Sequence, residues 1–310
     1  YSTERKQFGV SINSFGAIKS KLAEMATKSY VSEALCYRAG QDIENKINAL
    51  EADGMDASEA KLKGVEAFAI ECAIAKVQCS EVLDYVVDQG VQIYGGMGYS
   101  ADAPMERAYR DARISRIYEG TNEINRMLMV GMLLKRAMKG EINIFDPAMA
   151  VSKELTSVPS FETIDTSELF AAEKEVLKKL KKVFLMVGGK AAMALQDKIE
   201  DEQEIMMNLA DVMIEIYASE SAILRTEKLV SIKGEDACKN QIAMAQIYLS
   251  EAVDKINTAA KEAIGSFTKG DEQKVMLMGL KRFTKSELYN TKELRRQIAD
   301  YMIDQGKYPF

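Results

Sequence analysis

Tyr118-Glu119-Gly120-Thr121-Asn122-Glu123 separates a turn from a helix in this 310-residue chain, and the rest of the helical pattern can be read outward from it. Thr121 is a preferred helix N-cap residue, and apolar residues at helical spacing follow it to about Lys139. Glu119 lies between an aromatic residue and a glycine, just before this predicted helix. A carboxylate there can be a catalytic base, or it can be an acid stabilised by the helix dipole.

Helical periodicity continues on both sides of this stretch. Upstream it predicts helices from about Ser14 to Gly40, from Asp56 to Tyr94 and from Pro104 to Ile114. Downstream, Pro147 and Pro159 fall in a segment without a sustained period, which is typical of a linker. Further helices are predicted at about 167–196, 202–231, 235–266, 271–288 and 291–305.

These elements predict an all-α fold with two antiparallel helical bundles. The predicted domains are residues 1–140 and 166–310, joined by a linker at 141–165. The two halves also share a pattern, which suggests a duplicated bundle, although chance matching between Ala- and Glu-rich helices is the alternative. Leu22-Ala23-Glu24 with Tyr30, Ser32, Glu33 and Arg38 is repeated as Leu209-Ala210-Asp211 with Tyr217, Ser219, Glu220 and Arg225.

Composition narrows the class of function. The net charge of −6 leaves no broad cationic face for nucleic acid. The absence of histidine excludes Ser-His-Asp triads and most zinc sites, so we expect no metal. The four cysteines show no CxxC spacing, which favours a reducing compartment. No apolar run could span a bilayer and no signal peptide opens the chain, so a cytoplasmic location is expected.

Two other stretches could bind a ligand. Gln92, Ile93, Tyr94, Gly95 and Gly96 end a predicted helix, and bare glycines can admit a phosphate or a cofactor edge, although a plain turn is the alternative. In the first stretch of the chain, an Arg fork suits phosphate and a Phe ring suits a flat ligand, whereas a solvated basic turn is the alternative. The residues concerned there are Arg5, Gln7 and Phe8.

Taken together, these motifs resemble the C-terminal helical domain of acyl-CoA dehydrogenases. The order and spacing match over roughly residues 1–140. Phe15-Gly16 and the extra helices after the linker are closest to the very-long-chain branch. The motifs are Arg5-x-Gln7-Phe8-Gly9, Phe15-Gly16-x-Ile18, Lys21-Leu22-Ala23-Glu24-Met25, Gln92-Ile93-Tyr94-Gly95-Gly96-Met97-Gly98-Tyr99, Arg110-Asp111-Ala112-Arg113-Ile114 and Ile117-Tyr118-Glu119-Gly120-Thr121-Asn122-Glu123-Ile124.

The resemblance implies a flavoenzyme that desaturates a long-chain fatty acyl-CoA thioester between its α and β carbons. Glu119 would be the base, Tyr118 and Gly120 would face the substrate, and an electron-transferring flavoprotein would accept the electrons. In the family some of the flavin contacts come from a partner subunit, so a homodimer is implied. The residues at FAD-binding positions are Arg5, Gln7, Phe8, Gln92, Ile93, Tyr94, Gly95, Gly96, Thr121, Asn122 and Glu123.

The family's N-terminal helical domain and middle β domain have no counterpart in this sequence. We therefore expect a fragment that is inactive alone and binds FAD poorly. An acyl-CoA oxidase is one rival interpretation, and a non-catalytic helical dimerisation module is another.

A basic amphipathic segment at residues 173–187 has two interpretations. It can lie on an anionic membrane surface, which would place the protein peripherally on the inner face of a membrane, or on the mitochondrial matrix side in a eukaryote. It can equally be a bundle helix with a solvated Lys face.

Overall fold

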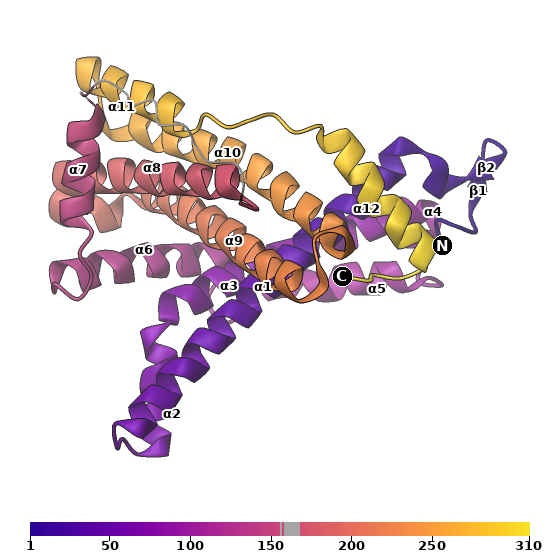
Figure 1. Ribbon diagram of the computed structural model, residues 1–310, viewed down its shortest axis with the longest axis horizontal. Coiled ribbons are helices and arrows are strands. Elements are labelled where there is room, and N and C mark those ends of the chain that lie inside the picture. The colour runs from indigo at the N-terminus through magenta and orange to yellow at the C-terminus, as the bar shows by residue number, and fades with distance from the viewer. Residues whose placement is uncertain (156, 158–167) are drawn as a thin grey trace.

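The structure is a computed structural model that describes residues 1–155, 157 and 168–310. These residues form 12 α-helices and one short hairpin, so the prediction of an all-α fold is confirmed (Figure 1). The helices are α1 (Gly16–Ala52), α2 (Ala57–Ala67), α3 (Ala69–Tyr94), α4 (Gly96–Tyr99), α5 (Pro104–Arg113), α6 (Asn122–Met138), α7 (Phe145–Leu155), α8 (Ala171–Leu195), α9 (Gln203–Lys233), α10 (Lys239–Phe267), α11 (Gly270–Phe283) and α12 (Thr291–Gln305).

The smaller elements lie at the ends of these helices. The hairpin pairs β1 (Lys6–Gln7) with antiparallel β2 (Val10–Ser11). The 3-10 turns are η1 (Ile12–Ser14), η2 (Ile114–Arg116), η3 (Gln196–Asp201) and η4 (Asp236–Cys238).

The helix predicted at 271–288 ends at Phe283, and three further features differ from the sequence prediction. The first helix does not end near Gly40 but continues to Ala52, and with α2 it forms an arm that projects from the body (Figure 1). The helix predicted from Asp56 to Tyr94 is divided at Phe68, whose backbone leaves the helical region with φ −111° and ψ 27°. Helix α7 occupies part of the predicted linker, where Val151 is buried; residues 156 and 158–165 of that linker lie outside the described residues.

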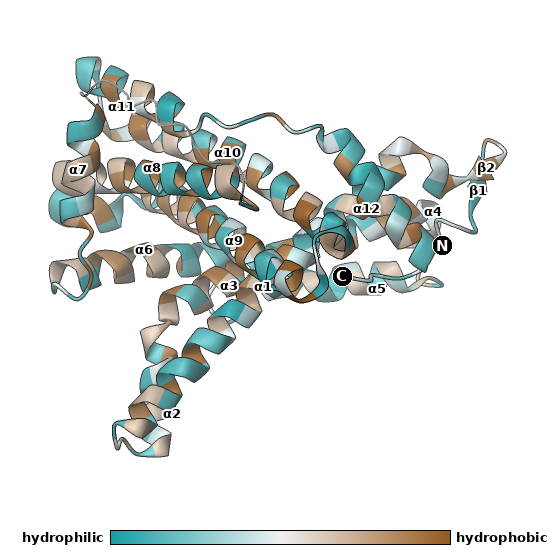
Figure 2. Cartoon of the chain, viewed as in Figure 1, coloured by the Kyte–Doolittle hydropathy of each residue, from teal (hydrophilic) through white to brown (hydrophobic). Residues whose placement is uncertain are grey.

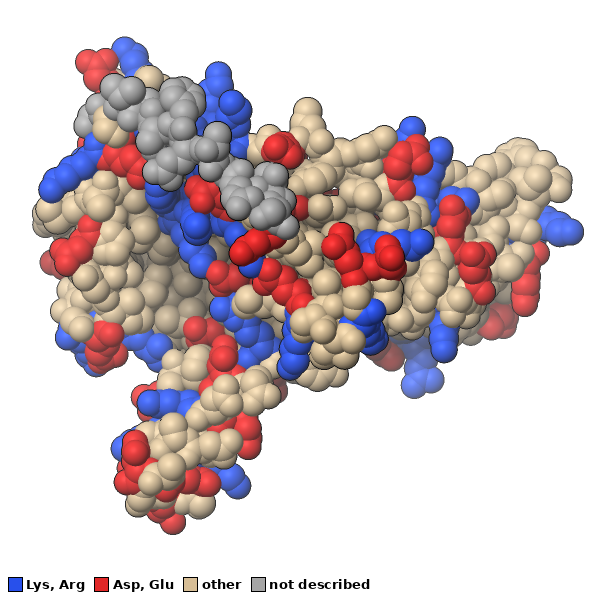
Figure 3. All heavy atoms as spheres, viewed as in Figure 1, with Lys and Arg blue, Asp and Glu red and all other residues tan. Residues whose placement is uncertain are grey.

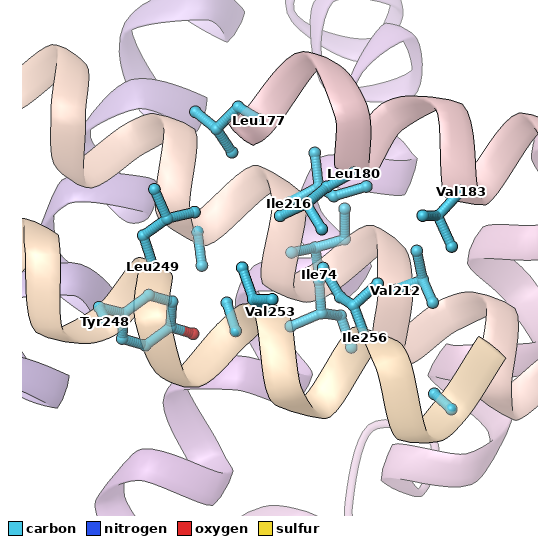
Figure 4. Close-up of a cluster of buried hydrophobic side chains, with 14 of the residues drawn as sticks. Ile74, Leu177, Leu180, Val183, Val212, Ile216, Tyr248, Leu249, Val253 and Ile256 are labelled. Atoms are coloured by element: carbon cyan, nitrogen blue, oxygen red, sulfur yellow. The ribbon is translucent and has the colours of Figure 1, made fainter. Parts of the chain in front are cut away.

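One hydrophobic core extends through both halves of the chain. Ile74 of α3 lies in the same cluster as Leu180 of α8, Ile216 of α9 and Val253 of α10 (Figure 4). The outer helix α12 is largely hydrophilic, but its buried Ile298 joins that cluster (Figure 2). The two predicted bundles are therefore packed against each other through buried side chains.

Helices α1 and α9 support the predicted duplication. They pack together, and an arginine of each helix contacts a glutamate and a tyrosine of the other. The two arginines occupy equivalent positions in the repeat, and so do the two glutamates and the two tyrosines. Such reciprocal contacts are the mark of a two-fold related pair, here within one chain. The pairs are Arg38 with Glu220 at 3.0 Å and over the ring of Tyr217 at 4.5 Å, and Arg225 with Glu33 at 2.9 Å and over the ring of Tyr30 at 4.3 Å.

The basic helix α8 behaves as a bundle helix. Its apolar residues Leu177, Leu180 and Val183 are buried in the shared core, so this face is not available to a membrane in the folded chain. Its lysines pair with acids of neighbouring helices: Lys182 lies 2.8 Å from Glu154, and Lys181 binds Glu220. Positive and negative side chains are interspersed on the face in Figure 3. Among the described residues, no helix is both apolar enough and long enough to traverse a bilayer.

Two cysteines meet at the contact between α1 and α3. The Sγ atoms of Cys36 and Cys79 are 3.3 Å apart, and Cys36 is exposed. A hydrogen bond from the Cys79 thiol stabilises the Cys36 thiolate and lowers the pKa of Cys36 to about 7. Burial instead raises the pKa of Cys72 above its usual value.

We expect Cys36 to be alkylated by iodoacetamide with a half-maximal rate near pH 7, because only the thiolate reacts. Cys72 should react only at higher pH, since burial disfavours its thiolate. Mass-spectrometric mapping of alkylated peptides across a pH series measures both rates. Cys79→Ala should move the Cys36 midpoint up toward about 8.5, the pKa of a free thiol. Equal midpoints in the two proteins would contradict the role of the Cys79 hydrogen bond.

Candidate active site

Glu119 occupies a strained turn between η2 and α6. Its φ is +56° and that of Gly120 is +77°, so two consecutive residues adopt the left-handed conformation. A non-glycine residue in that region costs about 1–2 kcal/mol and persists only where surrounding structure enforces it. Thr121 then caps α6, because its Oγ1 accepts a hydrogen bond from the backbone N–H of Ile124 at 3.3 Å. The predicted start of this helix is confirmed.

Polar side chains of α3 and α6 form hydrogen bonds to the backbone and side chains of this turn. The Lys76 Nζ of α3 donates to the carbonyl oxygen of Gly120 at 2.8 Å and to Asn122 Oδ1 at 2.7 Å. The Asn125 Nδ2 donates to the same Gly120 oxygen at 2.9 Å. Asn122 is 3% exposed, and its Nδ2 donates to Ser80 and Glu81, so its side chain is engaged within the protein.

An ion-pair group continues from this point into the second half of the chain. Arg126 of α6 makes two hydrogen bonds to Glu81 of α3, at 2.7 and 3.0 Å, and one to Asp211 of α9, at 2.8 Å. Burial disfavours the charged guanidinium, but the two carboxylates outweigh it and raise the pKa of Arg126. The turn that carries Glu119 is therefore connected to α9 through buried and half-buried polar contacts.

The Glu119 side chain itself is free. It is exposed, and no described residue forms a hydrogen bond or ion pair with its carboxylate. Exposed apolar side chains lie along η2, the turn and the start of α6, which is unusual for a solvated surface. These residues are Ile114, Ile117, Tyr118, Ile124 and Leu128, each between 41% and 56% exposed.

The hairpin near the N-terminus projects from the body (Figure 1). Phe8 and Gly9 form its two-residue turn with φ of +53° and +85°, the conformation that type I′ hairpins require. Phe8 is 92% exposed and makes an edge-to-face ring contact with Phe15, and Arg5 and Gln7 are exposed beside it. The hairpin thus presents a guanidinium and an aromatic ring to its surroundings.

The glycine turn lies beside this hairpin. The Tyr1 ring stacks on that of Tyr94 at 4.1 Å, and the Tyr1 hydroxyl donates to the Tyr94 carbonyl. Gly95 ends α3 with φ +60°, and a Cβ on Gly95 or Gly96 would meet open space, so this backbone is accessible. A Cβ on Gly98 would lie 2.4 Å from the Val91 carbonyl oxygen, so this position requires glycine.

The candidate residues of the glycine turn differ in exposure. Gln92 is exposed, whereas Ile93 is 8% exposed and packs inward. Thr121 is engaged as a cap, and Glu123 is exposed with its pKa lowered by its own backbone N–H and by Thr121. Ile93 and Asn122 can therefore contribute to a ligand site mainly through their backbones.

The structure assembles the candidates into two separate places. Lys76, which holds the Glu119 turn, and Tyr94, beside the glycine turn, lie toward opposite ends of α3, about 27 Å apart at a rise of about 1.5 Å per residue. One place holds Tyr118 to Glu123, and the other holds the hairpin with Gln92 to Gly96. Sequence reasoning missed Lys76, although a charged residue between the apolar Ala75 and Val77 was a usable signal.

The comparisons with known proteins agree with these motifs. Residues 1–134 and residues 179–282 each match the C-terminal domain of acyl-CoA dehydrogenases. A probable acyl-CoA dehydrogenase of Bacillus subtilis is 36% identical over 99% of this chain and 52% of its own length. The very long-chain specific acyl-CoA dehydrogenase of rat mitochondria is 27% identical over 94% of this chain and 43% of its own length.

A solved structure extends the likeness to three dimensions. The acyl-CoA dehydrogenase of Bacillus anthracis, solved in complex with FAD, superposes with a TM-score of 0.95 at 37% identity. It covers 100% of this chain, and this chain covers 52% of it. The chain thus spans about half the length of the relatives that it matches. With both halves matched to the family's C-terminal domain and the whole chain superposed on a solved member, this chain belongs to the acyl-CoA dehydrogenase family.

Proposed function

We propose that this chain is the C-terminal portion of an FAD-dependent enzyme that α,β-desaturates long-chain fatty acyl-CoA thioesters, with Glu119 as the base. The observation that carries the proposal is the strained, clamped turn, which presents an unpaired carboxylate among exposed apolar side chains. A non-catalytic dimerisation module would gain nothing from that strain. Backbone strain that surrounding contacts enforce is typical of functional sites.

Within this proposal, Glu119 removes a proton from the carbon next to the thioester carbonyl. Its exposed apolar neighbours, once covered by substrate, would exclude water from the carboxylate, and a general base must lie within hydrogen-bond reach of the proton that it removes. The backbone N–H of Glu119 donates to the thioester oxygen and stabilises the enolate-like charge that develops. Tyr118 and Gly120 border the acyl group.

The residues around the glycine turn fit FAD. Gly95 and Gly96 leave open space beside accessible backbone, and the projecting hairpin offers the Arg5 guanidinium for phosphate and the Phe8 ring for a flat group. FAD, when bound, supplies the acceptor for the hydride that leaves the β carbon. Gln7, Gln92, Ile93, Tyr94 and, at the other place, Thr121 to Glu123 are the further proposed contacts.

Lys76 and Tyr94, which adjoin the two places, lie about 27 Å apart along α3, and this separation supports a homodimer. The hairpin and the Glu119 turn of one chain therefore lie at separate places, and each would supply only part of a flavin site. We infer that the hairpin of one subunit completes the flavin site of its partner. The same reasoning predicts that this chain alone binds FAD weakly and is inactive. An electron-transferring flavoprotein is the proposed electron acceptor.

The test is made on the full-length protein that contains this chain. Anaerobic mixing with palmitoyl-CoA should bleach the oxidised flavin band within one turnover, and the enoyl-CoA product should appear in the same amount. Reoxidation by air that yields stoichiometric peroxide at each turnover would identify an oxidase instead. A purified protein without flavin, or a flavin that no saturated acyl-CoA bleaches, would overturn the proposal.

A further inference from the structure

We propose that Lys76, Arg126 and Asp211 are positioning residues for Glu119, so that the second half of the chain takes part in catalysis through α9. This inference rests on the proposed function and deepens it. The three side chains come from α3, α6 and α9. Lys76 contacts the turn directly, whereas Arg126 and Asp211 are connected to it through Glu81 and Asn122.

Lys76 fixes the backbone that aims the carboxylate. Its ammonium group bridges the Gly120 carbonyl and the Asn122 amide, one on each side of Thr121. Because Glu119 and Gly120 both adopt left-handed conformations, a contact that anchors the Gly120 carbonyl resists relaxation of both residues. Loss of this contact would let the base move, and a displacement of about 1 Å can lower a rate about 100-fold.

Arg126 connects this anchor to the second half. Glu81 accepts hydrogen bonds from both Asn122 and Arg126, and Arg126 also binds Asp211. The side chain of Arg126 is 15% exposed, whereas that of Asp211 is 44% exposed. A path of direct polar contacts therefore runs from Gly120 through Lys76, Asn122, Glu81 and Arg126 to Asp211 of α9.

The internal repeat contains a second copy of this ion-pair group without the base. Arg295 is the fifth residue of α12, as Arg126 is of α6, and it binds Glu251 at 2.6 Å and Glu24 at 3.3 Å. Its side chain is 18% exposed, close to the value for Arg126. Asn290 caps α12 as Thr121 caps α6.

The two copies differ in what precedes the helix. Leu288 occupies the place of Glu119, since each stands three residues before the first residue of its helix. Leu288 is 98% exposed and has no carboxylate. Gln246 stands five residues before Glu251 as Lys76 stands five before Glu81, but it donates to Glu173 instead of to a turn carbonyl. The same type of ion-pair group thus serves packing in one copy, and in the other it also adjoins a strained catalytic turn.

This duplication supplies a matched control for the full-length enzyme. Arg126→Met and Arg295→Met each remove one half-buried arginine from equivalent places, so similar losses of thermal stability are expected. Only Arg126→Met should lower kcat for palmitoyl-CoA, by about 10- to 100-fold, with KM and flavin content close to those of the wild type. Lys76→Met should give the same split between kcat and KM. Asp211→Asn should lower kcat, whereas Glu24→Gln should not.

The outcomes separate this inference from the proposed function. An inactive wild type refutes the proposed function and this inference together. A second outcome is an active wild type and an inactive Glu119→Gln variant. If the single variants Arg126→Met and Lys76→Met then keep kcat within about twofold of the wild type, only the positioning roles are refuted. Equal losses of kcat in Arg126→Met and Arg295→Met also refute them, because the effect would then follow stability. If Arg126→Met does not fold, the partly exposed pair Asp211→Asn and Glu24→Gln decides the question.

Discussion

Glu119→Gln in the full-length enzyme is expected to lower turnover of a saturated acyl-CoA by about 10²- to 10⁴-fold, the usual contribution of a positioned general base. The Gln side chain has nearly the same size as that of Glu, and Gln can adopt the same left-handed backbone conformation. The fold and the bound flavin should therefore be retained. What the amide lacks is a basic site for the α-proton. Stopped-flow bleaching of the flavin measures the loss, and exchange of the α-proton with deuterated solvent measures proton removal separately.

The matched control is Glu141→Gln, just beyond the C-terminal end of α6. Glu141 is exposed and pairs only loosely with Lys139, at 3.9 Å, so its substitution should leave turnover unchanged. Proton exchange and flavin bleaching should fall together in Glu119→Gln. Retained exchange in this variant would mean that another group removes the proton.

The sequence predicted the elements that local signals specify. Thr121 before an apolar period marked the start of α6, and Asp56 marked α2, which it caps by accepting hydrogen bonds from the N–H groups of Ser58 and Glu59. The break at Phe68 was not predicted, since no proline or glycine occupies that position. Helix α7 was missed because Pro147 was read as a helix breaker, although proline is tolerated in the first turn of a helix.

The candidate site was predictable in part. The residue types at the turn suggested a base, but its support depends on contacts between residues distant in sequence. Lys76 lies 2.8 Å from an oxygen of Gly120 only because α3 and α6 pack together. Arg126 meets Asp211 only because the second half folds onto the first. Neither contact leaves a periodic or local signal, so sequence patterns alone could not reveal them.

The continuous core gives the other large expected effect. Leu35 of α1 and Leu209 of α9 are 0% and 2% exposed and belong to one buried cluster. We expect Leu35→Ala and Leu209→Ala each to lower the free energy of unfolding by about 2–5 kcal/mol, from lost burial and the cavity that remains. Urea unfolding followed by circular dichroism and by tyrosine fluorescence measures both losses.

The decisive observation is whether Leu35→Ala and Leu209→Ala shift one urea-unfolding transition or two. If the halves were independent domains, each substitution would shift only the transition of its own half, and two steps would separate. Because Arg38, Arg225 and the buried residues of α1 and α9 interlock, we expect one transition that both substitutions shift. Leu62→Ala on the projecting arm, where Leu62 is 75% exposed, should change the free energy by no more than about 0.5 kcal/mol. If Leu209→Ala instead shows a second transition at lower urea while the first keeps its midpoint, the second half unfolds by itself. The shared core would then not hold α9 against the Glu119 turn.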